Sequence, residues 1–370
     1  MPWSIVAVTA LLIGAGLLGI ARVEELTEGG GRFFERQAVY GLAALIAMFL
    51  TTIPSYRVIC RFSYPLFLLA IVLLIVVYRC PAINGAHRWI RLGPIGIQPS
   101  DLAKVAFVLA LARYLMYRDN YRRLRGLVAP LAIALLPVVL ILREPDLGTS
   151  LVLLPVLFAM LFAAGAKRRD LLCTALAGVL VLPMLWTQMS LDQKSRVTAL
   201  FDQPSPSREA GADGYQLQQA KRFRSLGGVW GSLLVGQPTD EQAVYRLPEA
   251  RSDFIFSVLG ERLGLPGMAL ILGLYAFLVW KALAIAAETR EPFGRLLATG
   301  VAALVAVEVV INTGMTVGLL PVTGLSLPLV SSGGSGLLIH GIAIGLVLNV
   351  GLRPGYEVAN EPFRWVMEGK

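Results

Sequence analysis

Charged side chains in this sequence gather in short clusters at the ends of long apolar runs. The first cluster, GAHRWIRLGPIGIQPSDLAK at residues 85–104, contains Arg88, Arg91, Asp101 and Lys104. Asp101 and Lys104 are three residues apart, so they share one face of a helix. Neighbouring cations suit an anionic ligand such as a diphosphate, although a helix start with an internal ion pair also accounts for Asp101 and Lys104. We treat all four residues as candidates for binding a substrate.

A second cluster, REPDLGTS at residues 143–150, places an arginine and two acids between two apolar runs. Asp146 can cap the helix that follows it, since aspartate is a favoured N-cap residue. Capping does not account for Arg143 and Glu144 beside it. Glu144 and Asp146 are therefore further candidates for contact with a polar substrate.

A third cluster surrounds Asp253, which lies between a polar loop and the apolar run FIFSVL. Residues 254–286 are too many for one ordinary membrane crossing, and glycines and a proline around Gly264 interrupt them. We expect a short apolar element before the true span, either a tilted extension or a helix on the membrane surface. Either arrangement puts the Asp253 carboxylate at the membrane surface, where it could act as a general base or only cap a helix.

The fourth cluster is residues 311–336, which are apolar yet rich in glycine and proline. Irregular backbone at membrane depth is tolerated where it lines a cavity or is buried in protein, so this segment is predicted to wall a cavity. Glu308 and Asn312 are four residues apart and could point into that cavity, or could form a hydrogen bond between helices. Ser331 and Ser335 of this segment are also candidates for binding a substrate.

The sequence shows no spacing typical of a metal site. The cysteines Cys60, Cys80 and Cys173 are far apart and odd in number, so neither a disulfide framework nor a zinc or iron-sulfur centre is indicated. His340 is expected to be hydrogen-bonded inside the protein. No cofactor is indicated, and the sequence leaves open whether a divalent cation such as Mg²⁺ or Mn²⁺ assists.

The elements that must position these clusters are membrane-spanning helices. Of the 370 residues, 56% are hydrophobic and only 15% are charged. Soluble domains carry about 25% charged residues, so a soluble globular enzyme is excluded. A span needs about 20 apolar residues, and we interpret residues 1–370 as one all-α polytopic membrane domain. The ten predicted spans are 3–20, 37–55, 63–79, 99–117, 127–142, 147–165, 170–187, 266–286, 295–315 and 335–352.

The basic residues predict the orientation in the membrane. If both termini are cytoplasmic, the cytoplasmic loops hold about twice as many lysines and arginines as the short external loops, in line with the positive-inside rule. The polar segment 188–252, between spans seven and eight, is then a large extracytoplasmic loop with a short helix expected over 215–226. The net charge of +9 suits anionic membrane lipids, and nucleic acid is not expected as a partner.

In this order, the clusters resemble the SEDS family (shape, elongation, division and sporulation), which contains RodA, FtsW and SpoVE. The matching segments are GAHRWIRLG, QPSDLAK, EPDLGT, LPEARSDFIF and GLLPVTGLSLPLVSSGGSG, and the resemblance covers nearly the whole chain. The PVTG motif favours an elongation-type, RodA-like member of the family, whereas parts of residues 226–262 look more like the division type.

The resemblance implies a peptidoglycan glycosyltransferase of the bacterial cytoplasmic membrane. Such an enzyme polymerises lipid II, a disaccharide-pentapeptide on undecaprenyl diphosphate, at the outer face of that membrane, and it inverts the anomeric carbon. The resemblance also implies a class B penicillin-binding protein, a transpeptidase, as partner. The biological role would be cell-wall biogenesis in elongation, which sets cell shape, or in cell division.

Individual residues follow from the resemblance by position. Asp253 matches the aspartate of the DFIF motif, to which the family's catalysis is ascribed. Lys104 matches the lysine of QPS-acid-x-A-K, and Asp101 matches its acidic residue, where glutamate is commoner. Further departures from the family pattern are Ser332 for tyrosine, Gly336 for serine, and Glu308 for an uncharged residue, commonly glutamine.

Two other classes of function fit parts of the sequence. A flippase or other transporter of a lipid-linked precursor would favour polar groups near mid-membrane and matching broken helices in two halves, and only Glu308 supports it. A non-catalytic scaffold for a transpeptidase would have little need for Asp253 together with Asp101 and Lys104.

Overall fold

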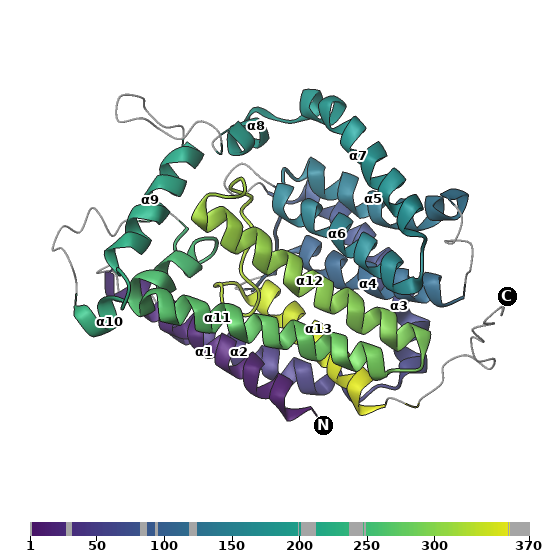
Figure 1. The fold of residues 1–370 in the computed structure, drawn as a ribbon, viewed down its shortest axis with the longest axis horizontal. Helices are drawn as coiled ribbons and strands as arrows, with labels where there is room; N and C mark the ends of the chain where they lie inside the picture. Colours follow the sequence, from purple (N-terminus) through teal and green to yellow (C-terminus); the bar gives the residue numbers. More distant parts are fainter. Residues whose placement is uncertain are drawn as a thin grey trace.

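Long helices make up most of the part of the chain that the structure describes (Figure 1). The computed structural model describes residues 2–26, 32–81, 87–92, 95–117, 124–198, 200, 212–236, 247, 249–353 and 355. Each of the ten predicted spans overlaps one helix, with bounds that differ by several residues for some of them. These helices are α1 (Trp3–Leu26), α2 (Phe33–Leu50), α3 (Tyr56–Val76), α4 (Pro99–Met116), α5 (Val128–Arg143), α6 (Leu147–Ala164), α7 (Arg168–Gln188), α11 (Ile255–Glu288), α12 (Pro292–Val317) and α13 (Gly334–Leu352).

The all-α membrane architecture is confirmed by the length and composition of these helices. Eight helical stretches in the described part of the chain are long and apolar enough to cross a membrane, and they contain α1, α2, α3, α5, α6, α11, α12 and α13. Helix α4 has the length of a span but carries the charged residues Asp101, Lys104 and Arg113. The exact count of ten spans therefore stays a prediction.

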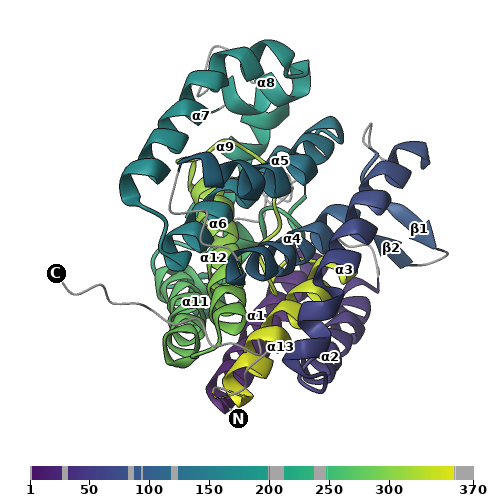
Figure 2. The same ribbon diagram turned by 90° about the vertical axis from the view of Figure 1, so that its right-hand side faces the viewer.

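Helix α12 lies inside the bundle, where it packs against α4, α6, α11 and α13 (Figure 2). Glycines bring α13 close to α2. A Cβ atom added at Gly341 would lie 2.4 Å from the carbonyl oxygen of Ala44, and one added at Gly345 would lie 2.3 Å from that of Met48. Such small residues let helix backbones approach each other in a membrane. The packing brings together α4, α12 and α13, each of which carries buried polar side chains.

Three shorter helices lie at one end of the bundle, while the start of α1 and the end of α13 lie at the other (Figure 1). They are α8 (Leu191–Thr198), α9 (Ala212–Leu226) and α10 (Ser232–Val235), and α9 confirms the helix predicted over 215–226. Helix α9 packs against α11 and α12. Much of the rest of the predicted loop 188–252 falls outside the described residues.

Helix α11 is interrupted where the sequence predicts a break. Gly264 has φ 68° and ψ −164°, and Pro266 follows it. The close packing there leaves no room for a side chain, because a Cβ atom at Gly264 would lie 2.3 Å from the carbonyl oxygen of Val229. The apolar element expected before the true span is thus the first part of α11, joined to the span by this break.

Two further elements surround the buried polar residues, a β-hairpin and a run without helix. A short antiparallel hairpin, β1 (Ile90–Leu92) and β2 (Ile95–Ile97), precedes α4, with Ile90 paired to Ile97. Helix α12 ends at Val317, its C-cap Gly318 has the left-handed conformation with φ 82°, and the chain then runs to Gly333 without a regular helix. This run lies within the segment that the sequence predicts to wall a cavity.

The predicted orientation gives a direct labelling test. Ser225 is exposed on α9, in the segment predicted to be external, and Arg169 is exposed in the first turn of α7, which is predicted to be cytoplasmic. In a cysteine-free background, Ser225→Cys should react with a membrane-impermeant thiol reagent in intact spheroplasts. Arg169→Cys should react only after lysis. The reverse pattern would contradict the topology. Ser207, another natural choice for this test, lies outside the described residues.

Candidate active site

A cavity of about 340 Å³ opens where the polar clusters meet. The start of α4, the start of α6, helix α8, the turn before α11, the irregular run after α12 and the start of α13 all contribute to its wall. The sequence-predicted residues on its lining are Arg88, Asp101, Lys104, Asp253 and Ser331. Gly324, Leu325 and Gly333 also line it, so the prediction that 311–336 walls a cavity is confirmed.

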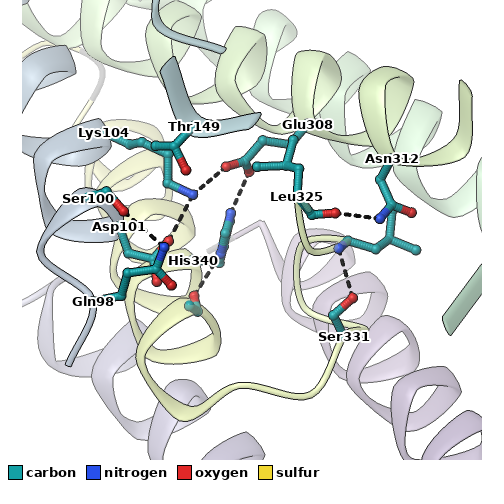
Figure 3. Close-up of polar contacts among 12 residues, drawn as sticks. Gln98, Ser100, Asp101, Lys104, Thr149, Glu308, Asn312, Leu325, Ser331 and His340 are labelled. Carbon is teal, nitrogen blue, oxygen red and sulfur yellow. Dashed lines mark hydrogen bonds and ion pairs between the residues drawn. The ribbon is translucent and has the colours of Figure 1, made fainter. Parts of the chain in front are cut away.

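A connected series of buried polar groups forms one side of this cavity (Figure 3). The Nζ of Lys104 lies 3.0 Å from Oδ1 of Asp101 and 2.6 Å from Oε1 of Glu308. The other oxygen of Glu308 lies 2.6 Å from Nε2 of His340, whose Nδ1 lies 2.7 Å from the carbonyl oxygen of Gly336. The expectation that His340 is hydrogen-bonded inside the protein is confirmed.

Local sequence explains how Asp101 and Lys104 come together. Pro99 occupies the first turn of α4, where its missing N–H is not needed, and Asp101 and Lys104 follow one turn apart on the same face. Lys104 is 1% exposed and Glu308 is fully buried. Unpaired charges at this depth would be very costly, so the direct contact between Lys104 and Glu308 is a condition for burying either one.

Asp253 lies in the turn that leads into α11. Helix α11 begins at Ile255, its N-cap position is Phe254, and no side chain in the described part of the protein caps it. Asp253 therefore does not act as the helix cap that the sequence left as an alternative. Its carboxyl group lines the cavity.

Backbone contacts hold the Asp253 turn in place. The side-chain amide of Asn312 donates to the carbonyl oxygen of Asp253 at 2.9 Å and to that of Leu325 at 2.6 Å. The hydroxyl of Ser331 donates to the carbonyl oxygen of Ser252. Asn312 and Ser331 thus join the irregular run after α12 to the turn that presents Asp253.

The surroundings of Asp253 favour a carboxyl group that can exchange protons near neutral pH. Burial raises the pKa of Asp253 to about 6, and the negative charge of Glu249 adds to the shift, while Arg196 opposes it. A general base works best when its pKa lies near the working pH. Asp253 is therefore the residue of this cavity best suited to accept a proton from a substrate.

The 143–150 cluster supports the cavity from the α5–α6 turn. Asp146 is the N-cap of α6, where its Oδ1 accepts from the backbone N–H of Thr149 at 3.2 Å. Arg88 donates from Nε to the carbonyl oxygen of Glu144 at 3.0 Å and also to that of Pro145. Asp146 is thus a cap, as its spacing suggests, and Arg88 is anchored at the edge of the cavity.

Glu144 has an unusual environment because its carboxyl group is fully buried with no hydrogen-bond partner among the described residues. Burial raises the pKa of Glu144 to about 8, and the nearby charge of Asp146 adds to the shift. Glu144 is therefore protonated at neutral pH. It lies beside the cavity wall but is not on the lining.

This protonation predicts how stability depends on pH. A raised carboxyl pKa stabilises the fold while the proton is bound, so this contribution is complete below about pH 4.5 and is lost as the pH rises through about 8. The unfolding temperature of purified protein should therefore fall by a few degrees more between about pH 6.5 and 9 in the wild type than in Glu144→Gln. Equal losses in both proteins would contradict the assignment.

The structure does not bring every predicted residue to the cavity surface. Arg91 is exposed on β1 and is not on the lining. The hydroxyl of Ser335 accepts from the backbone N–H of Gln98 at 3.1 Å, and it lies behind the wall. Glu308 and Asn312 also lie behind the lining. Glu308 contacts the lining residues Lys104 and His340, and Asn312 holds the turn that presents Asp253.

Other cavity residues were not predicted from the sequence. Arg196 of α8 donates to the carbonyl oxygen of Thr323 at 3.3 Å and carries a positive charge close to Asp253. Gln98, Gln193 and Glu249 also line the cavity. The only available signal for Arg196 was its place in the polar segment 188–252, and nothing in that segment indicates which part of it contacts the bundle.

Within the described ranges, no group of three histidine, cysteine, aspartate or glutamate side chains is placed to hold a metal ion. Of the carboxylates that line the cavity, Asp101 is paired with Lys104 of the protein itself. We therefore assign no chemical step to a metal.

Comparisons with known proteins agree on one family. The family model of the FtsW, RodA and SpoVE cell cycle proteins matches residues 3–353. The probable peptidoglycan glycosyltransferase FtsW of Trichlorobacter lovleyi is 34% identical over 327 residues, covering 87% of this chain and 84% of that protein.

Solved structures agree with the family model. A chain of a peptidoglycan synthase complex matches with a TM-score of 0.80 and 31% identity, covering 95% of this chain and 98% of that one. The rod shape determining protein RodA of Thermus thermophilus matches with a TM-score of 0.72 and 29% identity, covering 96% of this chain and 97% of that one. The chain described here belongs to the FtsW, RodA and SpoVE family of cell cycle proteins.

Proposed function

We propose that this protein is a peptidoglycan glycosyltransferase that polymerises lipid II at the outer face of the bacterial cytoplasmic membrane. One observation carries the proposal: a single cavity holds Asp253, a carboxyl group with a pKa of about 6, together with the cations Arg88, Lys104 and Arg196. A base and a set of fixed cations are what a sugar transfer from a diphosphate needs.

The reaction is a single displacement. The hydroxyl group of the acceptor sugar attacks the anomeric carbon of the donor, and Asp253 accepts the hydroxyl proton as the new carbon–oxygen bond forms. The bond between the anomeric carbon and the diphosphate oxygen breaks on the opposite side, so the configuration inverts. A positioned base of this kind contributes about 10²- to 10⁴-fold to the rate.

The leaving diphosphate gains negative charge as this bond breaks. Fixed cations in a site shielded from water stabilise such charge without having to reorganise. Lys104 is held rigidly by Asp101 and Glu308, and Arg88 is held by carbonyl oxygens of the α5–α6 turn. We assign these two residues to the diphosphate, and Arg196 to the region around Asp253.

The experiment that tests the function uses the purified protein in detergent or nanodiscs with lipid II as the only substrate. Glycan polymer longer than the starting disaccharide is the expected product. A protein that binds lipid II but forms no polymer would contradict the enzyme and favour a scaffold. Movement of lipid II between leaflets of proteoliposomes without polymer would favour a flippase.

We also propose a class B penicillin-binding protein as the partner of this chain. The similarity to a chain of a peptidoglycan synthase complex supports an assembly of this kind. Co-expression of the protein with the class B penicillin-binding proteins of the same bacterium should give one stable complex that survives purification in mild detergent. Separate elution of every pair would contradict the proposal.

A further inference from the structure

His340 stands out among the buried polar residues of this site because both of its ring nitrogens face hydrogen-bond acceptors. Its Nδ1 lies 2.7 Å from the carbonyl oxygen of Gly336, and its Nε2 lies 2.6 Å from Oε2 of Glu308. A carbonyl oxygen cannot donate, so Nδ1 must carry a proton. The short contact between Nε2 and Oε2 must then contain a second proton, on either the imidazole or the carboxyl group.

The neighbours of Glu308 decide which group holds this proton. The ammonium group of Lys104 lies 2.6 Å from Oε1 of Glu308, and a cation at this distance favours an ionised carboxylate. Glu308 is fully buried, so an ionised carboxylate there needs both of its oxygens paired. A protonated imidazole on Oε2 meets that need and completes an alternating series of charges from Asp101 through Lys104 and Glu308 to His340.

We propose that His340 is a positioning residue that is held as an imidazolium and keeps the charge of Lys104 available to the substrate. Without it, the single ammonium of Lys104 would be shared between two carboxylates, Asp101 and Glu308, and this side of the cavity would be negative. A negative wall repels a diphosphate. The positive charge of His340 balances Glu308, so the cavity wall at Lys104 can accept an anionic group.

The proposal also accounts for a departure in the sequence. Glu308 stands at a position where an uncharged residue was expected, and a buried carboxylate there would weaken the site unless a second cation compensated for it. His340 is on α13 and Lys104 is on α4, and both residues line the cavity. Glu308 on α12 lies behind the lining and connects the two cations (Figure 3).

The protonation of His340 can be measured directly, because the chain has only two histidines. His87→Asn leaves His340 as the only one. Nitrogen NMR of this protein, labelled with ¹⁵N-histidine in nanodiscs at neutral pH, should show two protonated ring nitrogens. The same measurement on His87→Asn with Glu308→Gln should show a neutral ring. A neutral ring in the first protein would overturn the proposal, wherever the remaining proton is found.

Kinetics test the effect on the substrate, and this part rests on the proposed function. His340→Gln should raise the KM for lipid II about tenfold, within the range that contacting residues show in double-mutant cycles, with a smaller change in kcat. Adding Glu308→Gln removes the uncompensated carboxylate and should return KM most of the way to the wild-type value.

A merely structural role for His340 predicts a different result. The double variant would then have the same KM as His340→Gln. Any loss of activity would follow the fraction of folded protein and not a change in KM. That result would overturn the positioning role. If the wild type makes no polymer at all, the proposed function fails, while the NMR measurement still decides the charge of His340.

Discussion

Replacing Asp253 with asparagine should lower the rate of glycan polymerisation by about 10²-fold or more, while the protein still folds and binds lipid II. Asparagine keeps the shape and the hydrogen-bonding oxygen of aspartate but cannot accept a proton. Because α11 has its N-cap position at Phe254, no capping interaction is lost in this variant. The measurement compares initial rates of polymer formation from lipid II with thermal stability and lipid II binding.

The matched control is Asp170→Asn, which makes the same chemical change in the first turn of α7, away from the cavity lining. It should leave the polymerisation rate near the wild-type value. Near-normal synthesis by folded Asp253→Asn protein would remove Asp253 from the catalytic role. The cavity would then need another base.

The pKa of Asp253 gives the same assignment a second, independent test. Because this pKa is raised to about 6, the carboxyl group is protonated and inactive as a base below that pH. Wild-type kcat/KM should therefore rise as the pH increases through about 6 and level off above it. The residual activity of Asp253→Asn should lack this rise.

Parts of the fold and the site could be predicted because they depend on local sequence. Apolar runs mark the helices, the glycine at 264 marks the break in α11, and Pro99 marks the start of α4. The pairing of Asp101 with Lys104 also follows from a spacing of three residues on one helix. None of these features needs knowledge of how distant helices pack.

Features that depend on tertiary packing could not be predicted. Glu308 and His340 lie far from Lys104 in the sequence, and only the packing of α4, α12 and α13 brings the three together. Arg91 looked equivalent to Arg88 as a cation in one cluster, but the hairpin carries Arg91 away while Arg88 binds the α5–α6 turn. Charge composition identified the kind of site but not every residue within it.

The second large effect is expected for Lys104→Met. This change leaves Asp101 and Glu308 without their shared cation in a buried site. Removing one partner of a buried ion pair lowers the free energy of unfolding by about 3–5 kcal/mol. The variant should therefore unfold at a lower temperature. It should also lose about 10²- to 10³-fold in polymerisation, the usual effect of removing one group that stabilises charge in a transition state.

Stability and catalysis can be separated with a second change. Adding Asp101→Asn to Lys104→Met removes the carboxylate that lost its cation, while Glu308 keeps its contact with His340. The double variant should regain much of the lost stability but remain about 10²-fold less active, because the cation at the diphosphate is still missing. Lys167→Met, at an exposed position before α7, controls for the loss of a lysine. If the stabilised double variant polymerised lipid II at nearly the wild-type rate, Lys104 would serve only to balance buried charge, and the diphosphate would have to be bound by the arginines alone.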